Sequence, residues 1–181
     1  MKLGDRKIRK ELHSGNIAIE PFDDSQLGGN SYDVRLSKTL ATYKDEELDC
    51  RRAHDVEYFD IPLGGYVIRP GQLYLGSTVE HIGSDKYLSC LEGKSSLGRL
   101  GVFIHVTAGL VDTGFFGNLT LEIMCIKPIR IYAGMPIGQL TWEKTTKVKQ
   151  LYSNKPSAKY SNQESRPVPS AMWRNFRLTG R

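Results

Sequence analysis

Along most of the chain, short apolar runs alternate with turn residues, and only the N-terminus departs from this pattern. There Ile8 and Leu12 lie four residues apart among charged side chains, and Gly15 follows. This spacing predicts a short amphipathic helix over residues 5–14, because side chains four apart share one helix face and glycine commonly ends a helix. The next apolar run, residues 17–21, ends in a proline and predicts a short strand.

The central region carries the period-two pattern of β-strands. Tyr32, Val34 and Leu36 alternate with polar residues, as expected for a strand with one buried face. Similar segments recur between glycines and prolines, and we expect strands at residues 57–61, 66–69, 73–79, 87–91, 101–107, 118–126, 129–132 and 137–142. Short strands at this spacing are typical of an all-β sandwich or barrel. No internal repeat or linker interrupts the series, so residues 1–181 are expected to form a single domain.

Composition adds constraints on the cellular environment. Hydrophobic residues make up 39% of the chain and charged residues 25%, as in ordinary soluble domains. Cys50, Cys90 and Cys125 are widely spaced and form no C-x-x-C pair, which favours free thiols in a reducing compartment. The first residues lack the apolar segment of a signal peptide, and no apolar run has the length of a membrane span. We therefore expect a cytoplasmic protein without a membrane partner.

The last part of the chain differs in character from the rest. The formal net charge is +5, and many basic residues lie in the first ten positions and in residues 144–159. They form no long unbroken run, so charge alone favours a solvated basic face. Residues 144–181 are polar, yet they carry several large side chains that disordered segments seldom contain: Tyr152, Tyr160, Met172, Trp173 and Phe176. We expect an arm that packs on a neighbouring subunit or on a bound ligand.

Two segments carry candidate chemistry, and the first is E-G-K-S-S-L-G-R-L-G at residues 92–101. Lys94 and Arg99 supply cations, Ser95 and Ser96 supply hydroxyls, and the glycines leave backbone N–H groups accessible. These groups bind phosphate oxygens. The segment is not a P-loop, because it lacks the upstream glycine at the required spacing. A glycine-serine turn with basic residues is common, so this motif has little specificity by itself.

The second segment, H-V-T-A-G-L-V-D-T-G-F-F-G-N-L-T-L-E-I, begins at His105. Asp112 falls in a glycine-flanked turn that is expected to link two strands. Glu122 falls in a strand whose apolar residues alternate with polar ones. Taken alone, this periodicity favours a place for Glu122 on the solvent face, the usual environment of a glutamate.

Together the two segments closely resemble the nucleotide-binding motifs of the dCTP deaminase family and, more distantly, those of the trimeric dUTPases. Family members carry G-R-S-S-x-x-R-L-G, then H-x-T-A-x-x-x-D-x-G-[FW]-x-G, then T-L-E or V-L-E. Further matches in family order are N-S-Y-D-V-R-L at residues 30–36, G-M-P-I-G-Q-L at 134–140, and K-Y-S-N-Q at 159–163 followed by Pro167, Pro169 and Ser170. The resemblance therefore spans nearly the whole chain.

The resemblance implies a fold and an activity. The fold would be a dUTPase-like distorted jelly roll, or β-clip barrel, with a short N-terminal helix, assembled as a homotrimer with active sites between subunits. The activity would be hydrolytic deamination of dCTP to dUTP and ammonia in the biosynthesis of dUMP and dTTP. The arm, residues 144–181, would close over the nucleotide. Further implied ligands are dUTP and, as an inhibitor, dTTP; no nucleic-acid partner is expected.

The resemblance also implies a role for each catalytic residue. Glu122 would take a proton from the water that attacks C4 of cytosine and then protonate the base and the departing ammonia. Such a role requires a pKa lifted towards neutrality by burial. Ser95 and Arg99 of a neighbouring subunit would help to place the water and position Glu122. Asp112 would accept a hydrogen bond from the sugar 3′-hydroxyl, and Phe115 would stack on the deoxyribose.

The remaining implied substrate-binding residues fall into three groups. The triphosphate would be held by Lys94, Ser95, Ser96, Gln139, Tyr152, Lys159 and Gln163. Backbone groups around Val106, Thr107 and Ala108 would read the cytosine edge. The set is completed by Leu97, Gly98, Thr120 and Leu121. Mg²⁺ would be held by the phosphate oxygens more than by protein ligands.

The residues also argue against a zinc deaminase. Such enzymes build their metal site from H-x-E and P-C-x-x-C. The four histidines, His13, His54, His81 and His105, all lie outside an H-x-E motif, and the cysteines are unpaired in sequence. We therefore expect catalysis without zinc and a structural role for His105.

Two departures from the family pattern keep an alternative open. Lys94 stands where arginine is more usual, which preserves the charge but loses the bidentate fork. Gly109 and Leu110 stand where members that only deaminate often carry His-Arg, and they are similar to the pair in members that also hydrolyse dUTP. A bifunctional dCTP deaminase/dUTPase that releases dUMP and diphosphate is therefore the alternative to the main prediction.

Three more distant functions are weighed against these two. A dUTPase without deaminase activity would leave Glu122 without a purpose. A single-stranded nucleic-acid-binding protein could use the basic, aromatic arm for stacking. A cupin-like metal enzyme would need clustered histidines, which the sequence lacks.

Overall fold

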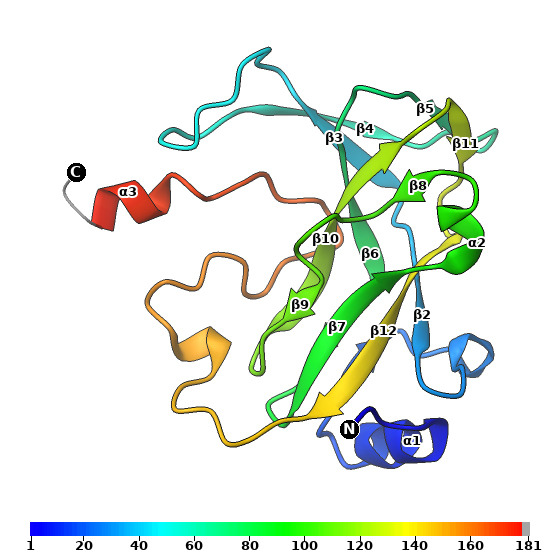
Figure 1. Cartoon of the computed structure of the whole chain (residues 1–181), viewed down its shortest axis with the longest axis vertical. Helices are drawn as coiled ribbons and strands as arrows, with labels where there is room; N and C mark the ends of the chain where they lie inside the picture. Colours follow the sequence, from blue (N-terminus) through cyan, green and yellow to red (C-terminus); the bar gives the residue numbers. More distant parts are fainter. Residues whose placement is uncertain (179–181) are drawn as a thin grey trace.

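The computed structural model describes residues 1–178 and begins with the predicted helix, α1 (Asp5–His13), at the bottom of Figure 1. Ile8 is fully buried on its inner face. Glu11 is also buried, with its carboxylate 2.6 Å from the Lys7 ammonium and 3.4 Å from that of Lys86. The hydrogen bond from Lys7 is the main reason that the pKa of Glu11 falls from 4.5 to about 2. A charged residue thus anchors the helix to the body of the protein.

Antiparallel strands form the rest of the scaffold (Figure 1). One sheet has the order β4 (Val56–Asp60), β3 (Thr39–Tyr43), β6 (Tyr74–Gly83), β10 (Phe116–Cys125) and β8 (Val102–Phe103), with β1 (Ala18–Glu20) paired to β6. A second sheet has the order β2 (Tyr32–Arg35), β12 (Pro136–Lys144), β7 (Tyr87–Gly93) and β9 (Leu110–Val111). A separate pair joins β11 (Ile129–Ile131) to β5 (Tyr66–Ile68). The predicted all-β class with one N-terminal helix is confirmed.

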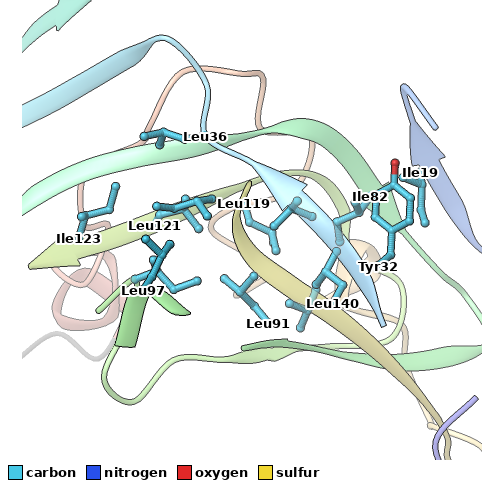
Figure 2. Close-up of a cluster of buried hydrophobic side chains, with 14 of the residues drawn as sticks. Ile19, Tyr32, Leu36, Ile82, Leu91, Leu97, Leu119, Leu121, Ile123 and Leu140 are labelled. Atoms are coloured by element: carbon cyan, nitrogen blue, oxygen red, sulfur yellow. The ribbon is translucent and has the colours of Figure 1, made fainter. Parts of the chain in front are cut away.

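The hydrophobic core lies between the two larger sheets, as Figure 2 shows. Leu121 and Ile123 of β10 are fully buried and point towards the second sheet, which contributes Leu91 of β7 and Leu140 of β12. Burial of one such side chain stabilises a fold by about 1.5–3 kcal/mol. Strand β10 therefore has one face fixed in the core, and its opposite face is free to form a site.

The strand predicted at residues 101–107 is mostly wrong, because only Val102 and Phe103 pair with β10. From Ile104 onwards the chain forms a loop that leads to β9. Conversely, β3 is a strand that the pattern did not reveal. Leu40 and Ala41 are both fully buried, so the sequence of β3 lacks a clean alternation.

The arm packs on its own chain. It contains the short helices η2 (Tyr152–Asn154) and α3 (Arg174–Leu178), and its path along the left of Figure 1 passes the β9–β10 region. The backbone N–H of Asn162 donates to the Phe116 carbonyl at 2.8 Å, and that of Ser170 donates to the Tyr43 hydroxyl at 2.9 Å. The arm therefore packs on its own subunit, and the expected packing on a neighbouring subunit or a bound ligand stays a prediction.

Candidate active site

A cavity of about 580 Å³ lies against the outer face of β10. The arm, the β9–β10 turn and the β3–β4 loop complete its walls. Its lining residues are Tyr43, Leu48, Leu73, Leu75, Leu91, Ala108, Leu110, Val111, Asp112, Phe115, Leu119, Thr120, Glu122, Tyr152, Tyr160, Gln163, Val168 and Ser170. The volume is that of a typical small-ligand pocket. Within residues 1–178, the charged residues of this lining are Asp112 and Glu122, so the cavity carries negative charge only.

Glu122 projects from the middle of β10 into this cavity. Alternation places Leu121 and Ile123 in the core and Thr120 and Glu122 on the opposite face. The paired residue on β6 is Leu75, which is apolar and also lines the cavity. No hydrogen bond or ion pair involves the Glu122 carboxylate in the part of the chain that the structure describes. The carboxylate is therefore available to a ligand, in largely apolar surroundings.

Polar contacts from β10 hold the arm over Glu122. The hydroxyl of Thr120 donates to Gln163 Oε1 at 2.7 Å and accepts from the backbone N–H of Val168 at 3.1 Å. The backbone N–H of Asn118 donates to the carbonyl of Gln163 at 2.9 Å. A Cβ at Gly117 would lie 2.8 Å from the Gln163 nitrogen, so glycine is needed for this close approach. The face that periodicity assigned to solvent is thus covered by the arm.

The β9–β10 turn brings the other predicted residues of the cavity together. Asp112 lies in this turn, and its carboxylate accepts an ion-paired hydrogen bond from the Lys155 ammonium at 3.2 Å. Phe115 is buried, and its ring centroid is 5.8 Å from that of Tyr152. The predicted residues Ala108, Asp112, Phe115, Thr120, Glu122, Tyr152 and Gln163 therefore line one cavity.

Three polar residues of the lining were absent from the predicted site: Tyr43, Tyr160 and Ser170. The Tyr43 hydroxyl accepts a hydrogen bond from the backbone of Ser170 at 2.9 Å, and burial raises the pKa of this phenol. The Tyr160 hydroxyl accepts one from the backbone of Ala171, also at 2.9 Å. Tyr160 follows the lysine of the K-Y-S-N-Q motif, which could have revealed it. Tyr43 belongs to β3, the strand without a sequence signal.

The phosphate-binding segment, residues 94–99, lies elsewhere. Figure 1 shows α2 (Ser95–Gly98) on the opposite side of the chain from η2 and β9. Both serines of α2 and the following Arg99 are exposed. The Lys94 ammonium is 2.5 Å from the carboxylate of Asp33, a residue of the N-S-Y-D-V-R-L match. No residue of the segment lines the cavity.

Other predicted substrate-binding residues also lie outside the cavity lining. Val106 is 64% exposed, and Thr107 is exposed beside it. Gln139 approaches the phosphate-binding segment, since its amide donates to the Gly93 carbonyl at 3.4 Å. Lys159 is half-buried on the arm. The side chains of Leu97 and Leu121 are packed in the core, so only their backbone groups could contact a nucleotide (Figure 2).

Two further observations concern metals and membranes. In residues 1–178, no three His, Cys, Asp and Glu side chains are arranged to hold a metal ion. His105 has Nε2 2.9 Å from the Leu91 carbonyl oxygen, a contact between the loop and β7. None of the helices in this part of the chain is long and apolar enough to span a membrane.

The fold and the cavity define a mainly antiparallel β-protein with an acidic ligand site under a C-terminal arm. A family model described as dCTP deaminase-like matches residues 2–145. The chain belongs to this family, which confirms the resemblance seen in the sequence.

Relatives and a solved structure agree with this assignment. The "dCTP deaminase, dUMP-forming" of Clostridium acetobutylicum is 43% identical over 176 residues, which cover 97% of this chain and 99% of that protein. The protein of the same name from Cytophaga hutchinsonii is 42% identical over the same shares of the two chains. The crystal structure of 2′-deoxycytidine 5′-triphosphate deaminase from Agrobacterium tumefaciens matches with a TM-score of 0.63 and 21% identity. That match covers 80% of this chain and 48% of the Agrobacterium chain, and it supports the fold.

Proposed function

We propose that this protein is a bifunctional enzyme that deaminates dCTP and hydrolyses the resulting dUTP to dUMP and diphosphate. The supporting observation is the free Glu122 carboxylate in a largely apolar cavity. The names of the relatives, "dCTP deaminase, dUMP-forming", favour this alternative over the main prediction, in which dUTP was the product.

The deamination needs one residue that both accepts and donates a proton. Glu122 accepts a proton from water as the water oxygen bonds to C4 of cytosine, and then delivers it to N3. Glu122 next takes the proton of the new C4 hydroxyl and passes it to the amino group, so that the C4–N4 bond breaks, the C4 carbonyl forms and ammonia leaves. The balance is dCTP and water to dUTP and ammonia. Apolar surroundings suit a carboxylate that alternates between charged and neutral forms.

The charge of the cavity supports a site that a neighbouring subunit completes, as in the proposed homotrimer. A triphosphate is a polyanion, and the described lining offers it two carboxylates without a cation. The exposed 94–99 segment has the opposite properties, with serine hydroxyls, Arg99 and, beside Asp33, Lys94. A neighbouring subunit could place this segment at the mouth of the cavity. Ser95 and Arg99 would then act on the water and Glu122, as the resemblance implies.

The loop before Asp112 supports the second reaction. Leu110 lines the cavity and is 64% exposed, so an apolar side chain borders the cavity where members that only deaminate often carry arginine. Gly109 is confined, since a Cβ there would lie 2.6 Å from the Leu91 carbonyl oxygen and 2.9 Å from the His105 ring. A His-Arg pair would therefore require a different path for this loop. In the second reaction, water attacks the α-phosphorus of dUTP and diphosphate leaves.

The test is to incubate the protein with dCTP and, separately, with dUTP, and to separate the products by chromatography. We expect equal amounts of ammonia, dUMP and diphosphate from dCTP, and dUMP and diphosphate from dUTP. Accumulation of dUTP from dCTP would limit the protein to deamination. Absence of ammonia would refute the proposed activity altogether.

Leu110→Arg is the variant that separates the two reactions, with Leu63→Arg as its control. Leu63 is fully exposed and lies outside the cavity lining, so both variants add one arginine to the surface. We expect Leu110→Arg to suppress dUMP formation before ammonia release, and Leu63→Arg to behave like the parent. Gly109 is a poorer target because its substitution would also disturb β7.

We propose that the enzyme needs Mg²⁺ only as a partner of the substrate's triphosphate. Mg²⁺ would be held by the triphosphate oxygens, and its charge would offset that of the phosphates. Treatment with a strong zinc chelator, followed by excess Mg²⁺, should restore full activity. One zinc ion per chain whose content tracks activity would contradict the zinc-free prediction.

Two of the arm's aromatic residues give the nucleic-acid alternative no support. Tyr152 and Tyr160 pack against the hydrophobic core and line the cavity. Their rings are therefore not displayed for base stacking on an outer surface. A cytoplasmic location and inhibition by dTTP stay predictions.

A further inference from the structure

Lys155 is a cation of the arm that lies beside the cavity without being part of its lining. Its ammonium is 3.2 Å from a carboxylate oxygen of Asp112, which lines the cavity. Among the ion pairs of residues 1–178, this is the one that includes a residue of the lining. Lys155 belongs to neither the phosphate-binding segment nor the K-Y-S-N-Q motif. Its partner is nevertheless one of the two carboxylates that give the cavity its charge.

The position of Lys155 follows from the way in which η2 docks on the turn that carries Asp112. The backbone N–H of Tyr152 donates to the Thr113 carbonyl at 2.9 Å, and that of Ser153 donates to the Gly114 carbonyl at 3.2 Å. Gly114 has φ +88°, and a Cβ there would lie 2.5 Å from the Leu151 side chain. Glycine therefore lets η2 sit directly on the turn, and Lys155 is delivered beside Asp112.

We propose that Lys155 is a positioning residue that holds the Asp112 carboxylate in place to accept the 3′-hydroxyl of the bound deoxynucleotide. The inference rests on the proposed function of the cavity. A carboxylate with a free rotamer must be ordered when the sugar binds, and that ordering costs binding free energy. An ammonium 3.2 Å away restricts the rotamer before the nucleotide arrives.

The pair is better suited to this role than to holding the fold together. The Lys155 side chain is 39% exposed and that of Asp112 is 43% exposed. Ion pairs of this exposure contribute little to stability. The backbone bonds of η2 do not depend on the lysine side chain. Removal of the ammonium should therefore leave the arm docked.

The experiment compares binding of dCTP with binding of 2′,3′-dideoxy-CTP, which lacks the 3′-hydroxyl. Calorimetry on the full chain uses a Glu122→Gln background, so that the nucleotide stays intact. Lys155→Ala should weaken dCTP binding about tenfold and dideoxy-CTP binding less than about twofold, the scale of one charge-assisted hydrogen bond. Lys155→Arg should retain binding within about threefold of the parent. The matched control is Lys149→Ala, which removes an exposed lysine from the same arm.

A double-mutant cycle tests whether Lys155 acts through Asp112. In an Asp112→Asn background, Lys155→Ala should have no further effect, because the carboxylate that the lysine positions is gone. Equal weakening of dCTP and dideoxy-CTP would assign the lysine to the phosphates and overturn the inference. A Lys155→Ala protein that matches Lys149→Ala would also overturn it, while leaving the proposed function intact. A parent that binds no dCTP would overturn both.

Discussion

The cavity and the 94–99 segment differ in how far a single chain encloses them. The cavity contains Glu122 and Asp112, and the chain's own arm covers it. The segment contains exposed serines and Arg99 on another side of the molecule. The cavity lining carries carboxylates and the segment carries cations. Because the two regions lie apart, the cations of the segment do not pair with the carboxylates of the cavity in the same chain. In the proposed homotrimer, one chain would build the reactive half of the site and a neighbour would supply the phosphate-binding half.

The largest expected effect is on the reactive half. Glu122→Gln should reduce ammonia release by at least about 100-fold, because the amide keeps the shape of the side chain but cannot carry the proton. Ammonia release and the thermal midpoint should be measured on the same preparation. A variant that turns over dCTP within threefold of the parent would remove Glu122 from the mechanism.

Loss of the arm should damage the same half. Truncation after Thr145 keeps β12 intact, since this strand ends at Lys144, but it removes Tyr152, Tyr160 and Gln163 from the cavity. We expect kcat/KM for dCTP to fall about 100-fold, the size of effect seen when reacting groups lose their alignment. Chemical denaturation gives the accompanying change in stability. Equal kinetics in the truncated and full-length proteins would show that the arm has no role in turnover.

Mixed trimers test whether the two halves come from different subunits. Arg99→Ala and Glu122→Gln are each expected to be inactive, yet they spoil different halves. In a randomly assembled one-to-one mixture, about a quarter of the intersubunit sites would contain two intact halves. Refolding the two variants together should therefore restore about a quarter of the parent activity. No restoration, with mixed assembly confirmed by mass, would place both residues in one subunit's site.

A smaller effect on dCTP kinetics is expected from Asp33, the residue of the N-S-Y-D-V-R-L match that contacts the phosphate-binding segment. The Asp33 carboxylate holds Lys94 at 2.5 Å, and both side chains are partly exposed. Asp33→Asn should raise KM for dCTP up to about fivefold with little change in kcat, because such pairs are worth up to about 1 kcal/mol. Steady-state kinetics separate the two constants. A fall in kcat alone would contradict this division of roles.

A substitution outside both regions should change stability without changing turnover, and it serves as a control for the variants above. Glu11→Gln should lower the free energy of unfolding by about 2 kcal/mol at pH 7, since a buried ion-paired carboxylate is lost. The folded pKa of Glu11 is about 2, below its ordinary 4.5, so its stabilisation is full above pH 4.5 and disappears as the pH falls towards 2. Urea unfolding at several pH values should show the parent approaching the variant in acid. Turnover at neutral pH should not change.

Much of the scaffold is encoded locally. The α1 amphipathic pattern, the alternation at residues 32–36 and the periodicity of β10 all appear in the structure. These patterns are readable because side chains one helix turn or two strand residues apart share a face. The sequence pattern missed strand β3 because the adjacent residues Leu40 and Ala41 are both buried. It wrongly predicted a strand over residues 104–107, where contacts with distant parts of the chain shape a loop.

The sequence by itself determined the family, the order of the motifs and the face of β10 on which Glu122 stands. Only the tertiary structure decided that this face is covered, because the cover comes from an arm some 40 residues further along the chain, through contacts such as Thr120 with Gln163. It also decided that residues 94–99 lie away from the cavity and that Lys155 meets Asp112. Local periodicity reports which side of an element is apolar. It holds no information about which distant segment will dock there, since that depends on the packing of the whole chain.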